Sequence, residues 1–196
     1  MLGLLVNVVI LETENVIVAS HLGKEIELIK LATELPNARY SSSGNPSVIV
    51  ELDRTNPKFI GHKRLKAAGV LFGNGKVLVT GIASLQEGKE IIAKLKSVIM
   101  EVDPKISTRR ATKIENMVIK FSFGKKLNLQ LISDSIPGSE YDPMRFQGLV
   151  LRVDEPLASF ILFESGVTVV TDIVSEAKAK KAFKQLKNLV ESSILA

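Results

Sequence analysis

The alternation of apolar and polar residues along the chain predicts several short strands. Residues 15–21 (Asn-Val-Ile-Val-Ala-Ser-His) are mostly apolar and rich in β-branched side chains, a pattern typical of a strand. Similar runs lie at 48–52, 70–72 and 77–80. The last two are separated by Gly73-Asn74-Gly75, whose residues supply the positive φ angles of a tight antiparallel hairpin. These runs predict an antiparallel sheet.

Apolar residues at spacings of three and four predict two helices in the first half of the chain. Residues 26–35 place apolar side chains between polar ones over a short helical stretch. From Ser84 to Met100 the same spacing continues for several turns, and Ser84 stands where the N-cap of a long amphipathic helix is expected. The second half repeats this order and ends in a long helix predicted between Ser175 and Leu195.

The recurrence of this order reflects an internal repeat. A shift of 101 positions superposes Asn15 on Asn116, Gly23-Lys24 on Gly124-Lys125, Pro36 on Pro137, Tyr40 on Tyr141 and Asp53 on Asp154. After residue 66 a shift of 91 superposes Leu71-Phe72 on Leu162-Phe163, Gly75 on Gly166, Val79-Thr80 on Val170-Thr171 and Ser84 on Ser175. The first copy therefore carries about ten extra residues near 55–66. Two copies are too few for a solenoid, so we expect two repeats, 1–101 and 102–196, related by a pseudo-twofold axis.

This repeat predicts an α+β fold in which both copies share one sheet. Each copy is expected to provide about five antiparallel strands and two helices. The long helices cover one face and leave the other open. Alternation along the strands places on this open face Asn15, Ile17 and Ala19, then Val70 and Phe72, then Leu78 and Thr80. Because a broad exposed apolar face usually marks a binding surface, we expect a partner there.

The composition narrows the chemistry that the chain can perform. It has 196 residues with no Cys and only two His, which excludes disulfides, thiolate zinc sites and His-rich metal centres, and we expect no cofactor. No motif assembles a nucleophile, a base and an orienting group, so an enzyme is not expected. No apolar run reaches the roughly 18–20 residues of a membrane span. The net charge of +5 is compatible with a nucleic-acid partner without establishing one.

Two motifs of the second copy carry a family resemblance. They are Tyr-Asp-Pro-Met-Arg-Phe-Gln-Gly-Leu at 141–149 and Ile-Leu-Phe-Glu-Ser-Gly at 161–166. Each copy also opens its first strand with Asn and runs through a glycine-bearing hairpin into a long helix. In combination with the repeat, the chain from about residue 10 to 195 resembles the TATA-box-binding protein family. The absence of a long low-complexity N-terminal segment makes it similar to a divergent archaeal form.

The resemblance implies a saddle whose concave sheet binds and bends A·T-rich promoter DNA through the minor groove, with the helices on the convex side. The paired polar groups that face base acceptors would be Asn15, Thr80, Asn116 and Thr171. The apolar side chains on the groove floor would be Ile17, Leu78, Val118 and Val169. The wedges between base steps would be Phe72, Phe146 and Phe163, and the phosphate contacts would be Lys76, Arg145 and Arg152.

The chain departs from the family pattern at several of these positions. Asn45 stands where the fourth wedge is expected. The residues that replace expected basic ones are Gly44, Glu51 and Val167. Asp172 replaces a glycine, and Lys120 places a charge at a strand position expected to be uncharged. We therefore expect fewer phosphate contacts than in a full family member and unequal kinks at the two ends of the DNA site.

The resemblance also implies an intracellular partner system. We expect a transcription initiation factor in the cytoplasm with the nucleoid, or in a nucleus, that binds double-stranded DNA and a transcription factor B-like protein. No membrane and no small-molecule substrate are expected. Because Met144 and Arg145 follow Asp142, the family's acidic turn is weakened, and the factor B-like protein would bind weakly or as a matching variant. The alternative is a protein-binding regulator with weakened DNA binding on the same scaffold.

The extra segment of the first copy carries a cluster of basic residues. These are Lys58, His62, Lys63, Arg64 and Lys66. Two interpretations stay open, a basic contact to DNA or to an acidic protein, and a solvated insertion without a role.

Overall fold

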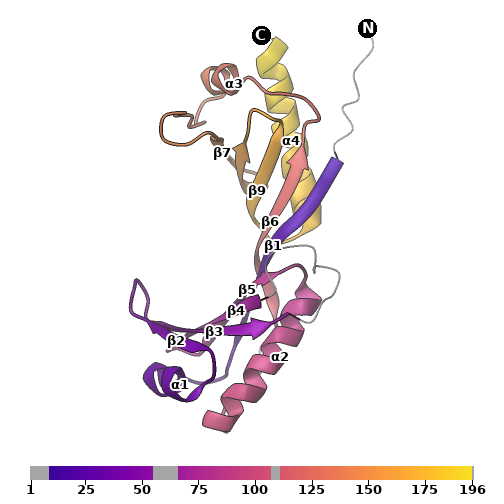
Figure 1. Cartoon of the computed structure of the whole chain (residues 1–196). Helices are drawn as coiled ribbons and strands as arrows, with labels where there is room; N and C mark the ends of the chain where they lie inside the picture. Colours follow the sequence, from indigo (N-terminus) through magenta and orange to yellow (C-terminus); the bar gives the residue numbers. More distant parts are fainter. Residues whose placement is uncertain (1–8, 55–65, 107–110, 196) are drawn as a thin grey trace. The chain divides into compact units, whose positions relative to one another are not determined.

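The computed structural model describes residues 9–54, 66–106 and 111–195, and these form nine strands and four helices (Figure 1). The elements are β1 (Val9–His21), α1 (Leu28–Glu34), β2 (Ala38–Ser41), β3 (Ser47–Asp53), β4 (Lys66–Phe72), β5 (Lys76–Ile82), α2 (Leu85–Val102), β6 (Lys113–Ser122), α3 (Leu129–Ser135), β7 (Leu149–Asp154), β8 (Leu157–Leu162), β9 (Val167–Ile173) and α4 (Glu176–Leu195). The predicted α+β class and the two helices in each repeat are confirmed.

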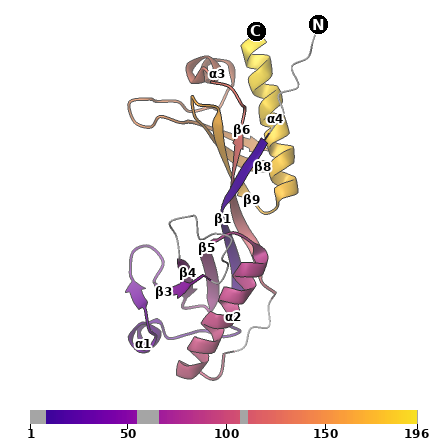
Figure 2. The same ribbon diagram turned by 45° about the vertical axis from the view of Figure 1, so that its right-hand side comes forward.

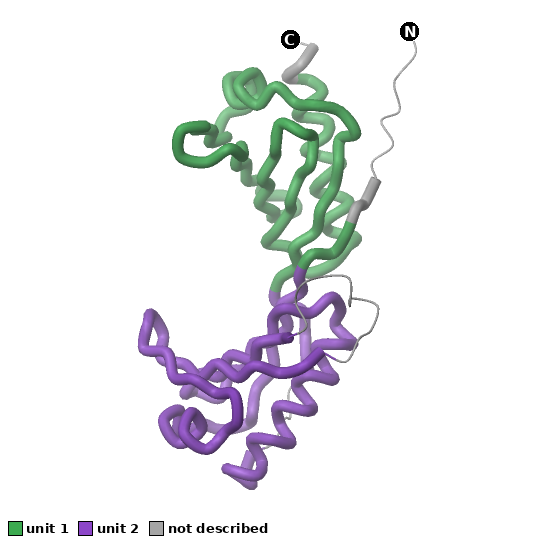
Figure 3. The backbone as a smooth tube through the Cα atoms, viewed as in Figure 1, with its two compact units in different colours: residues 1–14, 116–196 green, residues 15–115 purple. Residues whose placement is uncertain are grey.

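Two compact units divide the chain (Figure 3). Asn15–Glu115 form one unit, here the first-repeat unit, and Met1–Glu14 with Asn116–Ala196 form the other, the second-repeat unit. The strand order is β2-β3-β4-β5-β1-β6-β9-β8-β7, with antiparallel pairing in both units. Because β1 and β6 each contribute residues to both units, the compact units differ from the sequence halves 1–101 and 102–196, which stay a prediction.

The second repeat has one strand fewer than the expected five. Its described residues form β6, β7, β8 and β9, and an isolated bridge between Glu140 and Val150 takes the place of β2. The next residues turn instead of extending, since the backbone N–H groups of Arg145 and Phe146 both donate to the Asp142 carbonyl. Pro143 within this turn has no N–H for a strand ladder. The first repeat has five strands, which is the expected number.

In each unit both helices lie on the same face of the strands (Figures 1 and 2). In the first-repeat unit, alternate residues of β4 and β5 are buried beneath α2, and the helix contributes Ile91, Leu95 and Ile99 to the core. The N-cap prediction is confirmed, because Ser84 Oγ accepts a hydrogen bond from the Glu87 N–H at 3.1 Å. None of the helices within the described residues is long and apolar enough to cross a membrane.

The hairpin between β4 and β5 follows the prediction in part. Of the three proposed turn residues only Gly75 has a positive φ, of 83°. A Cβ at this position would lie 2.0 Å from the Lys24 carbonyl oxygen, so the turn needs glycine for space as well as for conformation. The hairpin therefore depends on one glycine rather than on three turn residues.

Candidate nucleic-acid interface

The face opposite the helices is open in both units, and it exposes alternate strand residues. Cross-strand partners in the first-repeat unit form the row Ile49, Val70, Leu78 and Ala19. The equivalent row in the second-repeat unit is Val150, Ile161, Val169 and Lys120. The residues predicted for this face are half-exposed, with one exception: Ala19 lies opposite Leu78 but is 5% exposed. Each open face is thus largely apolar.

A hydrogen-bonded Asn–Thr pair lies on the open face of the first-repeat unit. Asn15 Nδ2 donates to Thr80 Oγ1 at 2.9 Å, and the Gly81 backbone N–H donates to Asn15 Oδ1 at 2.9 Å. The second-repeat unit has the same arrangement. There Asn116 Nδ2 donates to Thr171 Oγ1 at 2.9 Å, and the Asp172 N–H donates to Asn116 Oδ1 at 3.0 Å.

A β-bulge positions each of these pairs. Val16 lies opposite Ile82 and Val18 opposite Val79, so β5 carries one residue more than β1 over this stretch. Gly81 lies in the bulge with a φ of 79°. The same register shift occurs between β6 and β9, where Asp172 has a φ of 63°. The bulge aims the backbone N–H of its residue at the Asn side chain.

These backbone contacts fix the orientation of both amides. An amide oxygen must face an N–H donor, so the Nδ2 groups of Asn15 and Asn116 are assigned by their surroundings. Each Nδ2 has one hydrogen on Thr and one left to donate. Each Thr hydroxyl accepts from Asn Nδ2 and also donates to the Oδ1 of the same Asn, at 3.4 Å for Thr80 and 3.3 Å for Thr171. Each unit therefore presents the second Nδ2 hydrogen of its Asn as a donor on the open face.

The side chains predicted for the groove floor surround these donors. Ile17 and Leu78 in the first-repeat unit are half-exposed, as are Val118 and Val169 in the second. All four lie on strands that also carry the Asn or Thr residues. These four residues lie on the open faces, as expected from the sequence. Their contact with a ligand stays a proposal.

Two predicted wedges pack on each other in the second-repeat unit. The rings of Phe146 and Phe163 have centroids 6.1 Å apart at an interplanar angle of 71°. Phe146 is 46% exposed. A Cβ on Gly148 would lie 2.7 Å from both Phe146 Cε1 and Ile161 Cγ2, so in this conformation the ring lies close over the glycine. The pair presents a large aromatic edge that the fold leaves uncovered.

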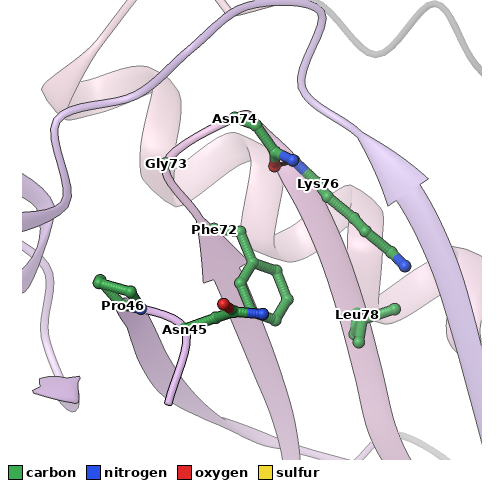
Figure 4. A pocket seen from close by; sticks show the side chains of 7 residues that line it. All are labelled: Asn45, Pro46, Phe72, Gly73, Asn74, Lys76 and Leu78. Carbon is green, nitrogen blue, oxygen red and sulfur yellow. Dashed lines mark hydrogen bonds between the residues drawn. The ribbon is translucent and has the colours of Figure 1, made fainter. Parts of the chain in front are cut away.

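The corresponding place in the first-repeat unit is hollow. Phe72 is half-exposed there, and the exposed Asn45 lies beside its ring (Figure 4). A hollow of about 380 Å³ is lined by Asn45, Pro46, Phe72, Gly73, Asn74, Lys76 and Leu78. The first-repeat unit thus presents one aromatic ring and one amide where the second presents two rings.

The predicted phosphate contacts differ in how they are held. Arg145 and Arg152 are exposed, and neither has an ion-pair partner in the part of the chain that the structure describes. Lys76 Nζ instead donates to Glu115 Oε1 at 3.1 Å. The carboxylate of Glu115 offsets the charge of Lys76 and occupies one of its three N–H donors.

Sequence reasoning missed three carboxylate–lysine pairs near the open faces. They are Lys76 with Glu115, Lys120 with Glu14, and Lys66 with Glu51 at 3.2 Å. Glu14 and Glu115 are related by the 101-residue shift, a signal that the repeat alignment already contained. The pairs offset the charges of Lys120 and Glu51, the two residues that depart from the family pattern on these strands.

The turn of the second repeat is ordered by Asp142. Its Oδ1 accepts from the Met144 N–H at 3.1 Å. Its carbonyl accepts from the N–H groups of Arg145 and Phe146, at 3.0 Å and 2.9 Å. The turn therefore has a defined backbone, and it holds Met144 93% exposed at its tip.

The basic cluster of the first copy lies mostly outside the described residues. Lys58, His62, Lys63 and Arg64 fall there, so the structure says nothing of their placement. Lys66 begins β4 and pairs with Glu51. Both interpretations of the cluster stay open.

Comparisons with known proteins agree with this architecture. The sequence matches the family described as transcription factor TFIID, or TATA-binding protein, over residues 10–102 and 111–192. It is 32% identical over 177 residues to the TATA-box-binding protein of Methanothermobacter thermautotrophicus, which covers 90% of this chain and 92% of that protein. For the TATA-box-binding protein of Pyrococcus furiosus the identity is 32% over 176 residues, covering 90% of this chain and 87% of the relative. The solved structure of Methanococcus jannaschii TBP matches with a TM-score of 0.75 and 32% identity, over 92% of this chain and 98% of that chain.

Proposed function

The chain belongs to the TATA-binding protein family as a divergent member of archaeal type, and from this we propose that it binds and bends A·T-rich promoter DNA through the minor groove. The family consists of DNA-binding transcription factors that are not enzymes. The observation that supports the proposal most directly is the oriented Asn–Thr pair on each open face. Its donors suit a groove that presents base acceptors.

The chemistry of the open faces favours A·T pairs. Both A·T and T·A present only acceptors in the minor groove, whereas guanine adds its N2 amino donor. The free hydrogens on Asn15 and Asn116 fit the acceptors. Ile17, Leu78 and Val169 around them offer guanine no acceptor, so a G·C pair at the donors would bury an unpaired amino group.

The exposed aromatic rings support bending. Minor-groove proteins insert apolar side chains between base steps, and the cost of unstacking is offset by the additional surface that bent DNA contacts. Phe146 and Phe163 form a two-ring wedge at one end, while Phe72 is the single ring at the other. The two ends of the site are therefore bent unequally, with the larger kink at the second repeat.

Three basic residues supply the phosphate contacts of this proposal. Arg145 and Arg152 are exposed, and Lys76 has N–H donors left beside the one that Glu115 accepts. Each phosphate neutralised adds about 0.9 to the slope of log affinity against log salt. DNA binding is therefore salt-dependent, with a slope of about 2 to 3 from these contacts.

Recruitment of a transcription factor B-like protein is the second part of the proposal. The Asp142 turn presents Met144 and Arg145 instead of several carboxylates, and the Asp142 carboxylate already accepts a backbone hydrogen bond. A partner that recognises this turn needs an apolar contact for Met144 and cannot depend on an acidic surface. An ordinary, strongly basic factor B would bind it weakly.

The alternative function is a protein-binding regulator on the same scaffold. It is favoured by the carboxylates of Glu51 and Asp172, which lie at or beside the open faces, and by the ion pair that holds Lys76. These groups weaken attraction to a polyanion. The two functions differ in whether the open faces bind duplex DNA at all.

One experiment separates them. A duplex with an A·T-rich centre, labelled with a fluorescent donor and acceptor at its ends, is titrated with the protein at several salt concentrations. The proposal expects binding, a change in energy transfer that reports bending, and a fall in affinity with salt. Phe163→Ala should reduce bending more than Phe72→Ala. Absence of binding at low salt would favour the regulator.

A further inference from the structure

We propose that Asn45 is a base-specificity residue that gives the first-repeat end of the DNA site a preference for guanine. This inference rests on the proposed function, because it assumes that the open faces bind the minor groove. It arises from a difference between the two units: the hollow beside Phe72 has an amide where the second-repeat unit has the ring of Phe146.

Two positions differ together at this place. In the second-repeat unit the Phe146 ring lies over Gly148, at 2.7 Å from where a Cβ would be. The residues at the equivalent positions of the first repeat are Asn45 and Ser47. Ser47 is buried and has the Cβ that Gly148 lacks, so a ring at position 45 would have less room than Phe146 has. The first repeat is therefore shaped for a small side chain at position 45.

The amide of Asn45 is available to a ligand. Asn45 is exposed, and among the described residues it has no hydrogen-bond partner. Its side chain lies next to the Phe72 ring at the hollow (Figure 4). A base step opened by Phe72 would therefore expose its base edges to an unpaired donor and an unpaired acceptor.

Guanine is the base whose minor-groove edge satisfies both groups. Its N3 accepts a hydrogen bond, and its N2 amino group donates one. An A·T pair presents acceptors alone, so it satisfies Nδ2 of Asn45 and leaves Oδ1 unpaired. A guanine beside the Phe72 wedge gains one hydrogen bond over adenine, and we expect about a tenfold preference from such a two-bond contact.

Asn15 and Asn116, which also lie on the open faces, explain why the guanine preference is confined to the first-repeat end of the DNA site. The oxygens of Asn15 and Asn116 already accept from backbone N–H groups in the bulges. These residues are donors only and disfavour guanine. The same residue type thus selects opposite bases, according to whether the backbone occupies its oxygen.

The test is a competition experiment with the full chain and A·T-rich duplexes. A single G·C pair is moved through both ends of the site, and the same series is made with inosine·C, which lacks only the N2 amino group. The wild-type protein should bind about tenfold more tightly when guanine is at one end position, and inosine should abolish the gain. Equal affinity for guanine and inosine at every position would overturn the inference.

Variants locate the preference. Asn45→Leu keeps the size without the polar atoms and should lose the guanine preference while still binding A·T-rich DNA. Asn45→Phe combined with Ser47→Gly introduces a second ring and makes room for it. This double variant should also lose the guanine preference. Phe146→Asn is the matched variant in the other repeat and should create a guanine preference at the opposite end. A preference unchanged in Asn45→Leu would contradict the assignment.

The experiment also separates this inference from the proposed function. If no duplex binds at low salt, the DNA-binding function itself is wrong. If all duplexes bind and bend but show no guanine preference, the function stands and the role of Asn45 is wrong. Circular dichroism of each variant confirms that it is folded.

Discussion

The two units share a topology but fill their cores with different side chains. The second-repeat unit packs aromatic rings, with Phe121 stacked on Phe183 at a centroid distance of 4.4 Å and an angle of 16°, and with Phe160 fully buried. The equivalent positions of the first-repeat unit hold Ser20, Ile92 and Gly69. The pattern of buried positions therefore determines this fold, and the residue that fills each position is free to change when its neighbours compensate.

The first-repeat unit compensates for its smaller core side chains in two ways. Its long helix packs closely on the strands, and a buried ion pair joins a strand to that helix. A Cβ on Gly69 would lie 2.7 Å from Leu95 Cδ2, so the long helix fills the space that a ring takes in the other unit. Arg54 Nε donates to Glu87 Oε1 at 2.8 Å, and the two side chains are 9% and 1% exposed. This ion pair ties the end of β3 to the first turn of α2.

The largest expected effect comes from breaking this ion pair. Glu87→Ala should destabilise the protein by about 3–5 kcal/mol, because it leaves Arg54 buried without this carboxylate. Lys178→Ala, at the exposed equivalent position of α4, should change stability by less than about 0.5 kcal/mol. Urea unfolding gives both values, and hydrogen exchange should show the loss in α2 and not in α4. A loss below about 1 kcal/mol for Glu87→Ala would contradict the strength assigned to the ion pair.

The next effect concerns a buried hydroxyl. Thr168 is fully buried, and within the described residues its Oγ1 has no hydrogen-bond partner. The equivalent residue of the first repeat is the buried Val77. Thr168→Val should therefore stabilise the protein by about 1–2 kcal/mol, and Val77→Thr should destabilise it by a similar amount. Thermal or urea unfolding measures both, and a destabilised Thr168→Val would show that the hydroxyl is satisfied.

A smaller effect concerns the charge in the second bulge. Asp172 has a positive φ like its counterpart Gly81, and its carboxylate accepts from Ser159 Oγ at 2.6 Å. Asp172→Asn keeps a residue type that tolerates this backbone and removes the charge. DNA affinity at low salt should rise about three- to tenfold, since one unfavourable charge near a phosphate costs about 1 kcal/mol in water. The gain should shrink with added salt, and an affinity that does not change would place Asp172 away from the DNA.

The smallest effect is a pH dependence in the first-repeat unit. Lys24 Nζ donates to Asp103 Oδ2 at 2.6 Å and lowers the pKa of that carboxyl below its ordinary value of 3.8. The ion pair therefore stabilises the fold above pH 3.8, and this contribution disappears as the pH falls through the lowered pKa. Lys24→Met should raise the pKa of Asp103 toward 3.8 in an NMR titration. Lys125→Met, at the equivalent exposed position, should leave it unchanged.

The elements with strong periodicity were predictable from the sequence. The long helices and the hairpin strands have regular apolar spacing. Because of the repeat, each of these patterns occurs twice in the sequence. β2 was missed because its residues form an edge strand that is mostly exposed and held by hydrogen bonds to β3. The start of β1 at Val9 was missed because Glu12, Thr13 and Glu14 interrupt the apolar pattern.

The candidate site was predictable in its residue types and not in its electrostatics. Asn15 and Asn116 were identified because the repeat pairs them, but their orientation depends on bulges, and an aspartate in the second bulge hides the glycine signal. The partners of Lys76 and Lys120 lie on other strands, so no local pattern reveals them. Burial of Thr168 without a partner among the described residues is likewise a property of tertiary packing.

The covalent fusion of the two repeats has a consequence for how a promoter acquires direction. In a dimer of identical chains every substitution appears twice, and a pseudo-palindromic DNA site would be bound equally well in both orientations. In a single chain the equivalent positions of the two repeats can hold different residues, here Asn45 in the first and Phe146 in the second. Each such difference distinguishes upstream from downstream, so under the proposed function the asymmetry of this molecule orients the transcription machinery on a nearly symmetric sequence.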